Sequence, residues 1–136
     1  MSSAIHRRPR EARLRDIVFA PRPISEFGAQ HEFFLLCLAA VSAASGVSPA
    51  DIRSPRRGRA PVARARHLAI YLQHVVFGAS LSCCGKSFAR DRTSVRHACA
   101  KIEDERDEPA FDCAVARLED ALLAQHAMLI EFSGFF

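Results

Sequence analysis

The sequence lacks an apolar run long enough to cross a membrane. The best candidate, Phe33 to Ala44, is shorter than the roughly 20 residues that a spanning helix needs. The N-terminal residues MSSAIHRRPREARLRD are basic and contain no apolar stretch of the length that a secretory signal requires. We therefore expect no membrane span and a cytoplasmic protein.

Metal-ligand and disulfide patterns are also missing. The histidines are scattered, and the cysteines show no paired Cys-x-x-Cys spacing, which argues against a zinc knuckle. An odd number of cysteines without an export signal argues against a disulfide scaffold. We expect no bound metal, and reduced, partly buried thiols at Cys37, Cys83, Cys84, Cys99 and Cys113.

No catalytic arrangement is legible in the chain. Neither a Ser-His-Asp nor a Cys-His nucleophile pattern is present. Gly85-Lys86-Ser87 matches the end of a phosphate-binding P-loop, but that motif needs glycine where Ser80 stands and must follow a strand. We therefore expect no enzyme, no cofactor and no small-molecule substrate.

The sequence does contain an ordinary globular composition with unevenly placed charge. Its 136 residues suit one domain plus tails, 49% are hydrophobic, and the net charge is +4 with a pI of about 9.1. One basic group spans residues 53–66, a second spans 86–101, and an acidic block follows at 103–108. Such segregation suggests one cationic face and a polyanionic partner, although a solvated surface explains charge alone equally well.

Apolar residues recur at helical spacing throughout, and no segment requires a β-strand. Capping and stop residues predict helices from Ser25 to Gly46, a short turn after Ser48, and helices from Pro61 to Gly78 and from Ser80 to Phe88. Two more follow, over residues 91–102 and from Pro109 onward. The fold class is all-α. It divides into a flexible basic arm (1–24), a helical domain (25–108), and an amphipathic helix with an apolar tail (109–136).

Two short helices joined by a tight turn at Ala89 and Arg90 have the form of a helix-turn-helix. The second helix of such a motif enters the major groove N-terminus first. Arg92 can contact guanine, Asp91 can accept from cytosine or cap the helix, and Thr93 can touch a thymine methyl. Ser94 and the helix-end N–H groups suit phosphate.

The run from Val62 to Glu103 resembles a known family. It contains Ala63-Arg64-Ala65-Arg66, Ser80-Leu81, Gly85, Phe88, Arg90-Asp91-Arg92-Thr93-Ser94-Val95 and His97-Ala98 with Lys101-Ile102-Glu103. These elements are similar to the duplex-binding C-terminal domain of the bacterial replication initiator DnaA, over roughly residues 30–105.

The resemblance implies binding to double-stranded DNA at sites like a DnaA box. It implies base contacts in the major groove from Asp91, Thr93 and Ser94, to which the helix reading adds Arg92. An arginine of the basic loop, Arg57 or Arg59, would enter the adjacent minor groove. The residues expected at phosphates are Arg64, Arg66, Lys86, Arg90, Arg96, His97 and Lys101.

The chain departs from the family pattern in three ways. Arg92 replaces the family's histidine, Ala89 stands alone where the family has a glycine pair, and no part of this sequence corresponds to the ATPase region. The resemblance therefore implies site binding without origin melting.

The sequence leaves three functions open. The chain could be a transcriptional regulator, or a replication modulator that competes with the initiator for its boxes. It could also be a protein-interaction module, a reading motivated by the apolar ending Met128 to Phe136. The C-terminal helix is also a candidate for pairing two copies of the chain.

Overall fold

A computed structural model of the chain describes residues 26–136, with side chains from residue 30 onward. These residues form helices and no strand, which confirms the all-α class. The predicted basic arm and the Ser25 cap lie outside the described residues. The helices are α2 (Glu26–Ser45), α3 (Pro49–Arg53), α4 (Ala60–Phe77), α5 (Leu81–Phe88), α6 (Arg92–Glu105) and α7 (Pro109–Ser133).

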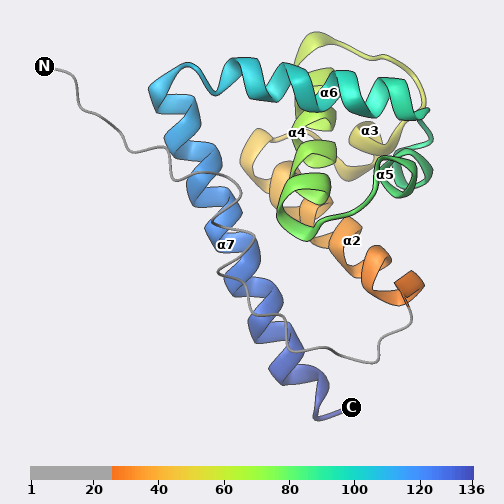
Figure 1. Cartoon of the computed structure of the whole chain (residues 1–136), viewed down its shortest axis with the longest axis vertical. Coiled ribbons are helices and arrows are strands. Elements are labelled where there is room, and N and C mark those ends of the chain that lie inside the picture. Colours follow the sequence, from red (N-terminus) through yellow and green to blue (C-terminus); the bar gives the residue numbers. More distant parts are fainter. Residues whose placement is uncertain (1–25) are drawn as a thin grey trace, which may run out of the picture.

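Helix α4 is the centre of the domain. It packs against α2, α3, α5, α6 and α7, and its buried side chains include Tyr71 and Leu72. Figure 1 shows α6 lying across one end of the bundle and α7 leading away from the end of α6. Burial of apolar side chains on several faces of α4 is the main stabilising contribution to the domain.

Side-chain caps fix where four of the helices begin. Ser48, Ser80, Asp91 and Glu108 each accept a hydrogen bond from the backbone N–H three residues later. At the other end, Gly78 closes α4 in the left-handed conformation that glycine adopts without steric penalty. The helix starts predicted at Ser48, Ser80 and Asp91, and the stop at Gly78, are confirmed.

The buried stripe of α7 differs from the sequence prediction. The apolar spacing predicts an inward face made of Phe111, Val115, Leu118, Leu122 and Met128 to Ile130. Val115 and Leu122 are buried, but Met128 and Leu129 are exposed at 55% and 44%. The other buried positions are polar, namely Asp112, Glu119 and His126. Apolar spacing is misleading here because Arg106 pairs with two carboxylates of α7, which lets polar side chains take buried positions.

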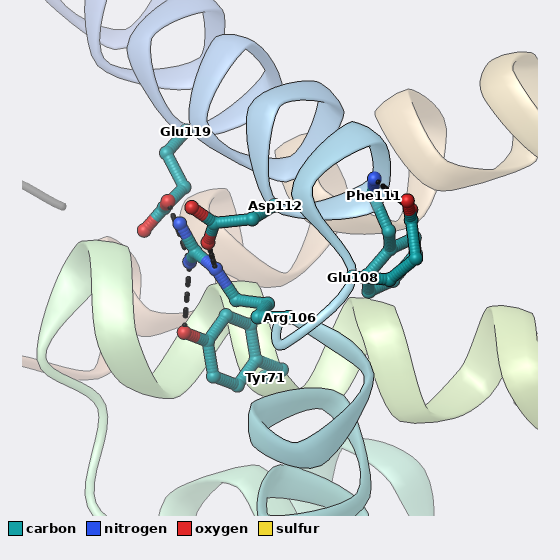
Figure 2. A network of polar contacts seen from close by, with 6 residues as sticks. All are labelled: Tyr71, Arg106, Glu108, Phe111, Asp112 and Glu119. Carbon is teal, nitrogen blue, oxygen red and sulfur yellow. Dashed lines mark hydrogen bonds and ion pairs between the residues drawn. The ribbon is translucent and has the colours of Figure 1, made fainter. Parts of the chain in front are cut away.

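Arg106 is the partner of those carboxylates (Figure 2). Its guanidinium lies 2.5 Å from Asp112 and 2.8 Å from Glu119, and it donates to the hydroxyl of Tyr71 at 2.9 Å. Burial alone would lower the pKa of Arg106, but these partners outweigh burial and raise it. The network ties the end of α6 to both α4 and α7.

Helices in the described part of the chain are too short or too polar to span a bilayer. Among residues 26–136, no group of three or more His, Cys, Asp or Glu side chains is arranged to hold a metal ion. The five cysteines are free: Cys37 and Cys84 are buried and Cys83 and Cys99 half-buried, whereas Cys113 is exposed and not partly buried as predicted. Burial raises the pKa of Cys84 to about 12 and that of Cys99 to about 11. Neither thiol is therefore ionised at neutral pH.

Candidate nucleic-acid interface

Helices α5 and α6 form a helix-turn-helix, and their connection is very tight. The N–H of Arg90 donates to the carbonyl of Gly85 at 2.8 Å. A Cβ atom at position 85 would lie 2.5 Å from the Arg90 carbonyl oxygen, so only glycine allows this approach. Ala89 takes the left-handed conformation, with φ of 51°, which turns the chain toward α6.

Helix α6 has one buried face and one exposed face. Val95, Ala98 and Ile102 pack into the core, with Cys99 half-buried beside them. Arg92, Thr93, Ser94, Arg96, His97 and Lys101 are exposed. The predicted recognition helix thus presents its polar residues to solvent while its apolar stripe fixes it to the domain.

The N-terminus of α6 is capped by Asp91. The carboxylate accepts from the Ser94 N–H at 2.7 Å, and this bond, followed by one with the Ser94 hydroxyl, holds the pKa of Asp91 below its ordinary value of 3.8. Asp91 itself is exposed. Its position suits both roles considered from the sequence, because one oxygen caps the helix and the residue is exposed to a ligand.

A groove of about 650 Å³ lies between α6, the first half of α4 and the loop at residues 54–59. Thr93 and Ser94 line it from α6 with hydroxyl groups. Its other polar lining is basic: Arg57 lies on the loop, Arg66 and His67 on α4, His97 and Lys101 on α6, and Arg90 in the connection between α5 and α6. The two basic groups of the sequence therefore meet at one surface, as a polyanion-binding face requires.

The pKa of His67 is lowered in part by the positive charges of this groove. Burial lowers its pKa below the ordinary value of 6.5, and the charges of Lys101, His97 and Arg66 lower it further, while Glu105 acts in the opposite direction. Its ring lies 6.5 Å from that of His97. In the free domain His67 is therefore mostly neutral at pH 7.

The remaining predicted contact residues lie around the groove. Arg57 and Arg59 are exposed on the loop, and Lys86 is exposed on α5. Arg64 is exposed too, but it forms an ion pair with Glu105 at 2.7 Å and its guanidinium lies 4.9 Å from the ring of Phe111. An exposed pair of this kind contributes little to stability and exchanges readily for another anion.

Arg66 does not lie where a phosphate contact requires. The residue is only 4% exposed. Its guanidinium donates to the backbone carbonyls of Ile52 at 2.8 Å, Asp51 at 3.0 Å and Arg57 at 3.3 Å. We therefore correct the expectation for Arg66, which holds the chain between α3 and α4 and is not assigned to a phosphate.

The domain is similar to known proteins. Residues 37–102 match the model of the bacterial dnaA protein helix-turn-helix family. Residues 37–102 are a dnaA-type helix-turn-helix domain. The crystal structure of a DNA replication initiation factor also matches, with a TM-score of 0.66 and 28% sequence identity over 74% of this chain. The chain spans 31% of the length of that structure.

The sequence pattern did not reveal the structural roles of two arginines, Arg66 within this dnaA-type domain and Arg106 just after it. Arg66 occupies the same helical stripe as Ile70, Gln73 and Phe77, all of them buried. That spacing was the available signal for its burial. Arg106 was overlooked within the acidic block, although it lies one turn beyond the buried Ile102.

Proposed function

We propose that the chain binds double-stranded DNA sequence-specifically, at sites like a DnaA box. The observation that carries this is the exposed N-terminus of α6, within a dnaA-type helix-turn-helix and beside a basic groove. Asp91, Arg92, Thr93 and Ser94 would read base edges in the major groove. The chain would act by binding, without catalysis.

The rest of the surface would fix the protein on the duplex. Arg57 or Arg59 would enter the minor groove from the loop. The residues proposed at phosphates are Arg64, Lys86, Arg96, His97 and Lys101. Arg90 was also expected there, but both of its Nη nitrogens donate to loop carbonyls, so it is not assigned to a phosphate. Phosphate contacts fix register and orientation, whereas base contacts select the sequence.

The test is fluorescence anisotropy with a labelled duplex carrying a DnaA-type box, compared with a scrambled duplex across a salt series. Tighter binding to the box, with a linear fall of log affinity against log salt, is expected. Each of Arg92→Ala and Thr93→Ala should cost about 1–3 kcal/mol on the box. Arg117→Ala, which removes an exposed arginine of α7 outside the groove, is the charge-matched control. Equal binding of wild type and Arg92→Ala/Thr93→Ala to the box would refute base readout by α6.

Regulation of transcription is the simplest role for such a domain, and control of replication by occupying the initiator's boxes uses the same surface. The same recognition helix would serve either role, so the two are separated by where the protein binds on the chromosome. Genome-wide occupancy should show many promoters in the first case and concentration at the origin in the second. Either pattern places the protein on the nucleoid, in the cytoplasm.

We also propose that two copies of the chain associate through α7. Support comes from the exposed apolar residues near its end, Met128, Leu129 and Phe132, and from a groove of about 330 Å³ beside them, lined by Leu35 and Ile130 among others. Sedimentation equilibrium should give a dimer that Phe132→Ser reverts to a monomer. A wild-type monomer at high concentration would refute the pairing and favour docking of a different protein.

A further inference from the structure

The loop between α3 and α4, residues 54–59, is held by arginine side chains from outside it. Arg90 donates through Nη1 to the carbonyl of Pro55 at 3.1 Å, and through Nη2 to the carbonyls of Ser54 at 3.1 Å and Arg56 at 3.5 Å. Arg66 donates to the next carbonyl along the loop, that of Arg57. Four successive carbonyls therefore accept from two guanidiniums.

The two arginines come from different elements. Arg66 is fixed within α4, where it also holds the end of α3. Arg90 lies in the helix-turn-helix connection, directly before the Asp91 cap of α6. Burial lowers the pKa of Arg66, and the nearby positive charge of Arg90 lowers it further. Arg90 thus links the loop to the start of the recognition helix.

A guanidinium suits this task because its donors are set in a rigid plane and can reach several carbonyls at once. Lysine has one ammonium group on a flexible stem and would retain the charge without the fork. The loop has few hydrogen bonds of its own. One is donated by the backbone N–H of Arg56 to the Ser54 hydroxyl at 3.2 Å. External donors therefore decide where its exposed arginines are held.

We propose that Arg90 is a positioning residue, which fixes the arginine loop relative to α6 so that both elements meet the duplex in one geometry. The inference rests on the proposed DNA binding and differs from a phosphate contact at this residue. Both Nη nitrogens already donate to loop carbonyls, and a phosphate contact would have to draw them away. Preorganisation of this kind raises affinity by removing the need to order the loop on binding.

The first experiment uses the full chain without DNA. Hydrogen exchange of the peptide covering residues 54–59 is measured in wild type, Arg90→Lys, Arg90→Ala and Arg96→Ala. Both Arg90 variants should exchange faster in the loop. Arg96→Ala, an exposed arginine of the same helix-turn-helix, should match wild type. Circular dichroism melting confirms that each variant is folded, and unchanged exchange in both Arg90 variants would overturn the proposal.

The second experiment measures duplex affinity in a double-mutant cycle. Arg90→Lys and Arg90→Ala should each weaken binding to the box about tenfold. In a background lacking Arg57 and Arg59, Arg90→Ala should have little further effect, while Arg96→Ala keeps its full effect. Rescue by Arg90→Lys, or additive losses, would assign Arg90 to a phosphate and overturn the inference. If wild type binds no duplex, the proposed function fails, whereas the exchange experiment still decides whether Arg90 orders the loop.

Discussion

At the scale of single residues, the turn of the helix-turn-helix depends on a glycine and an alanine. Gly85 leaves room for the Arg90 carbonyl, and Ala89 carries the positive φ. A left-handed conformation disfavours any residue with a Cβ, by about 1–2 kcal/mol. Ala89 is therefore a strained position next to the recognition helix, at the place where the family has glycine.

Ala89→Gly should stabilise the domain by about 0.5–1 kcal/mol, because relief of the strain exceeds the entropy that glycine adds to the unfolded chain. Urea unfolding measures the change. Ala100→Gly, at an exposed position inside α6, is the control and should destabilise the domain by about 1 kcal/mol. Destabilisation by both changes would contradict the assigned backbone conformation at Ala89.

We expect duplex affinity to vary with pH through the titration of His67. A bound phosphate backbone would favour the charged imidazole, so the pKa of His67 should rise on binding and affinity should increase as the pH falls through about 6.5. His67→Gln should flatten this dependence, and His31→Gln, on α2 outside the groove, should leave it intact. A dependence that survives His67→Gln would assign the proton uptake elsewhere.

The same histidine acts on stability with the opposite sign. Its pKa in the folded domain lies below the ordinary value, so the unfolded chain binds more protons between those two values. The free domain should therefore lose stability as the pH falls below about 6.5.

At the scale of elements, α6 combines a buried apolar stripe with an exposed start. Its cap matters for both, because Asp91 fixes the first turn that carries Thr93 and Ser94. The depressed pKa of Asp91 means that the cap's stabilisation is fully present above the ordinary value of 3.8 and is lost as the pH falls through the lower folded value.

Asp91→Asn should keep the cap, since asparagine caps helices as well as aspartate does, and Asp91→Ala should remove it. The amide proton of Ser94, followed by NMR, reports the cap directly. In wild type its signal should change on acidification, and in Asp91→Asn it should not, because the amide does not titrate. Equal acid titration in both proteins would show that another group controls this turn.

At the scale of the whole molecule, the Arg106 network joins the dnaA-type domain to α7. The end of α6, the middle of α4 and the first three turns of α7 meet at this one side chain (Figure 2). A buried ion pair of this kind specifies an arrangement more than it adds stability, because desolvation offsets much of the attraction. It fixes the angle at which α7 leaves α6.

Arg106→Ala should destabilise the protein by about 3–5 kcal/mol, because two carboxylates would remain buried without their partner. Urea unfolding gives the value. Arg117→Ala removes an exposed arginine from α7 and should change stability by less than about 0.5 kcal/mol. A small effect of Arg106→Ala would mean that α7 separates from the domain at little cost.

Much of the fold follows from local signals. The helix starts at Ser48, Ser80 and Asp91, the stop at Gly78 and the buried stripe of α6 are readable because capping and periodicity involve neighbours within one or two turns. The resemblance to the dnaA family is also readable, from the residue pattern between Val62 and Glu103. Where a charged side chain replaces an apolar one in a stripe, as in α7, the local signal misleads.

The sequence by itself determined the helices, their capping residues and the basic character of the surface, because these depend on residue type and short-range spacing. Only the tertiary structure decided which arginines are available to a ligand. Arg92 and Arg96 point to solvent, whereas Arg66, Arg90 and Arg106 donate to carbonyls, a hydroxyl and carboxylates on other elements. The physical reason is that a guanidinium is committed by the acceptors packed around it, and those acceptors come from parts of the chain distant in sequence.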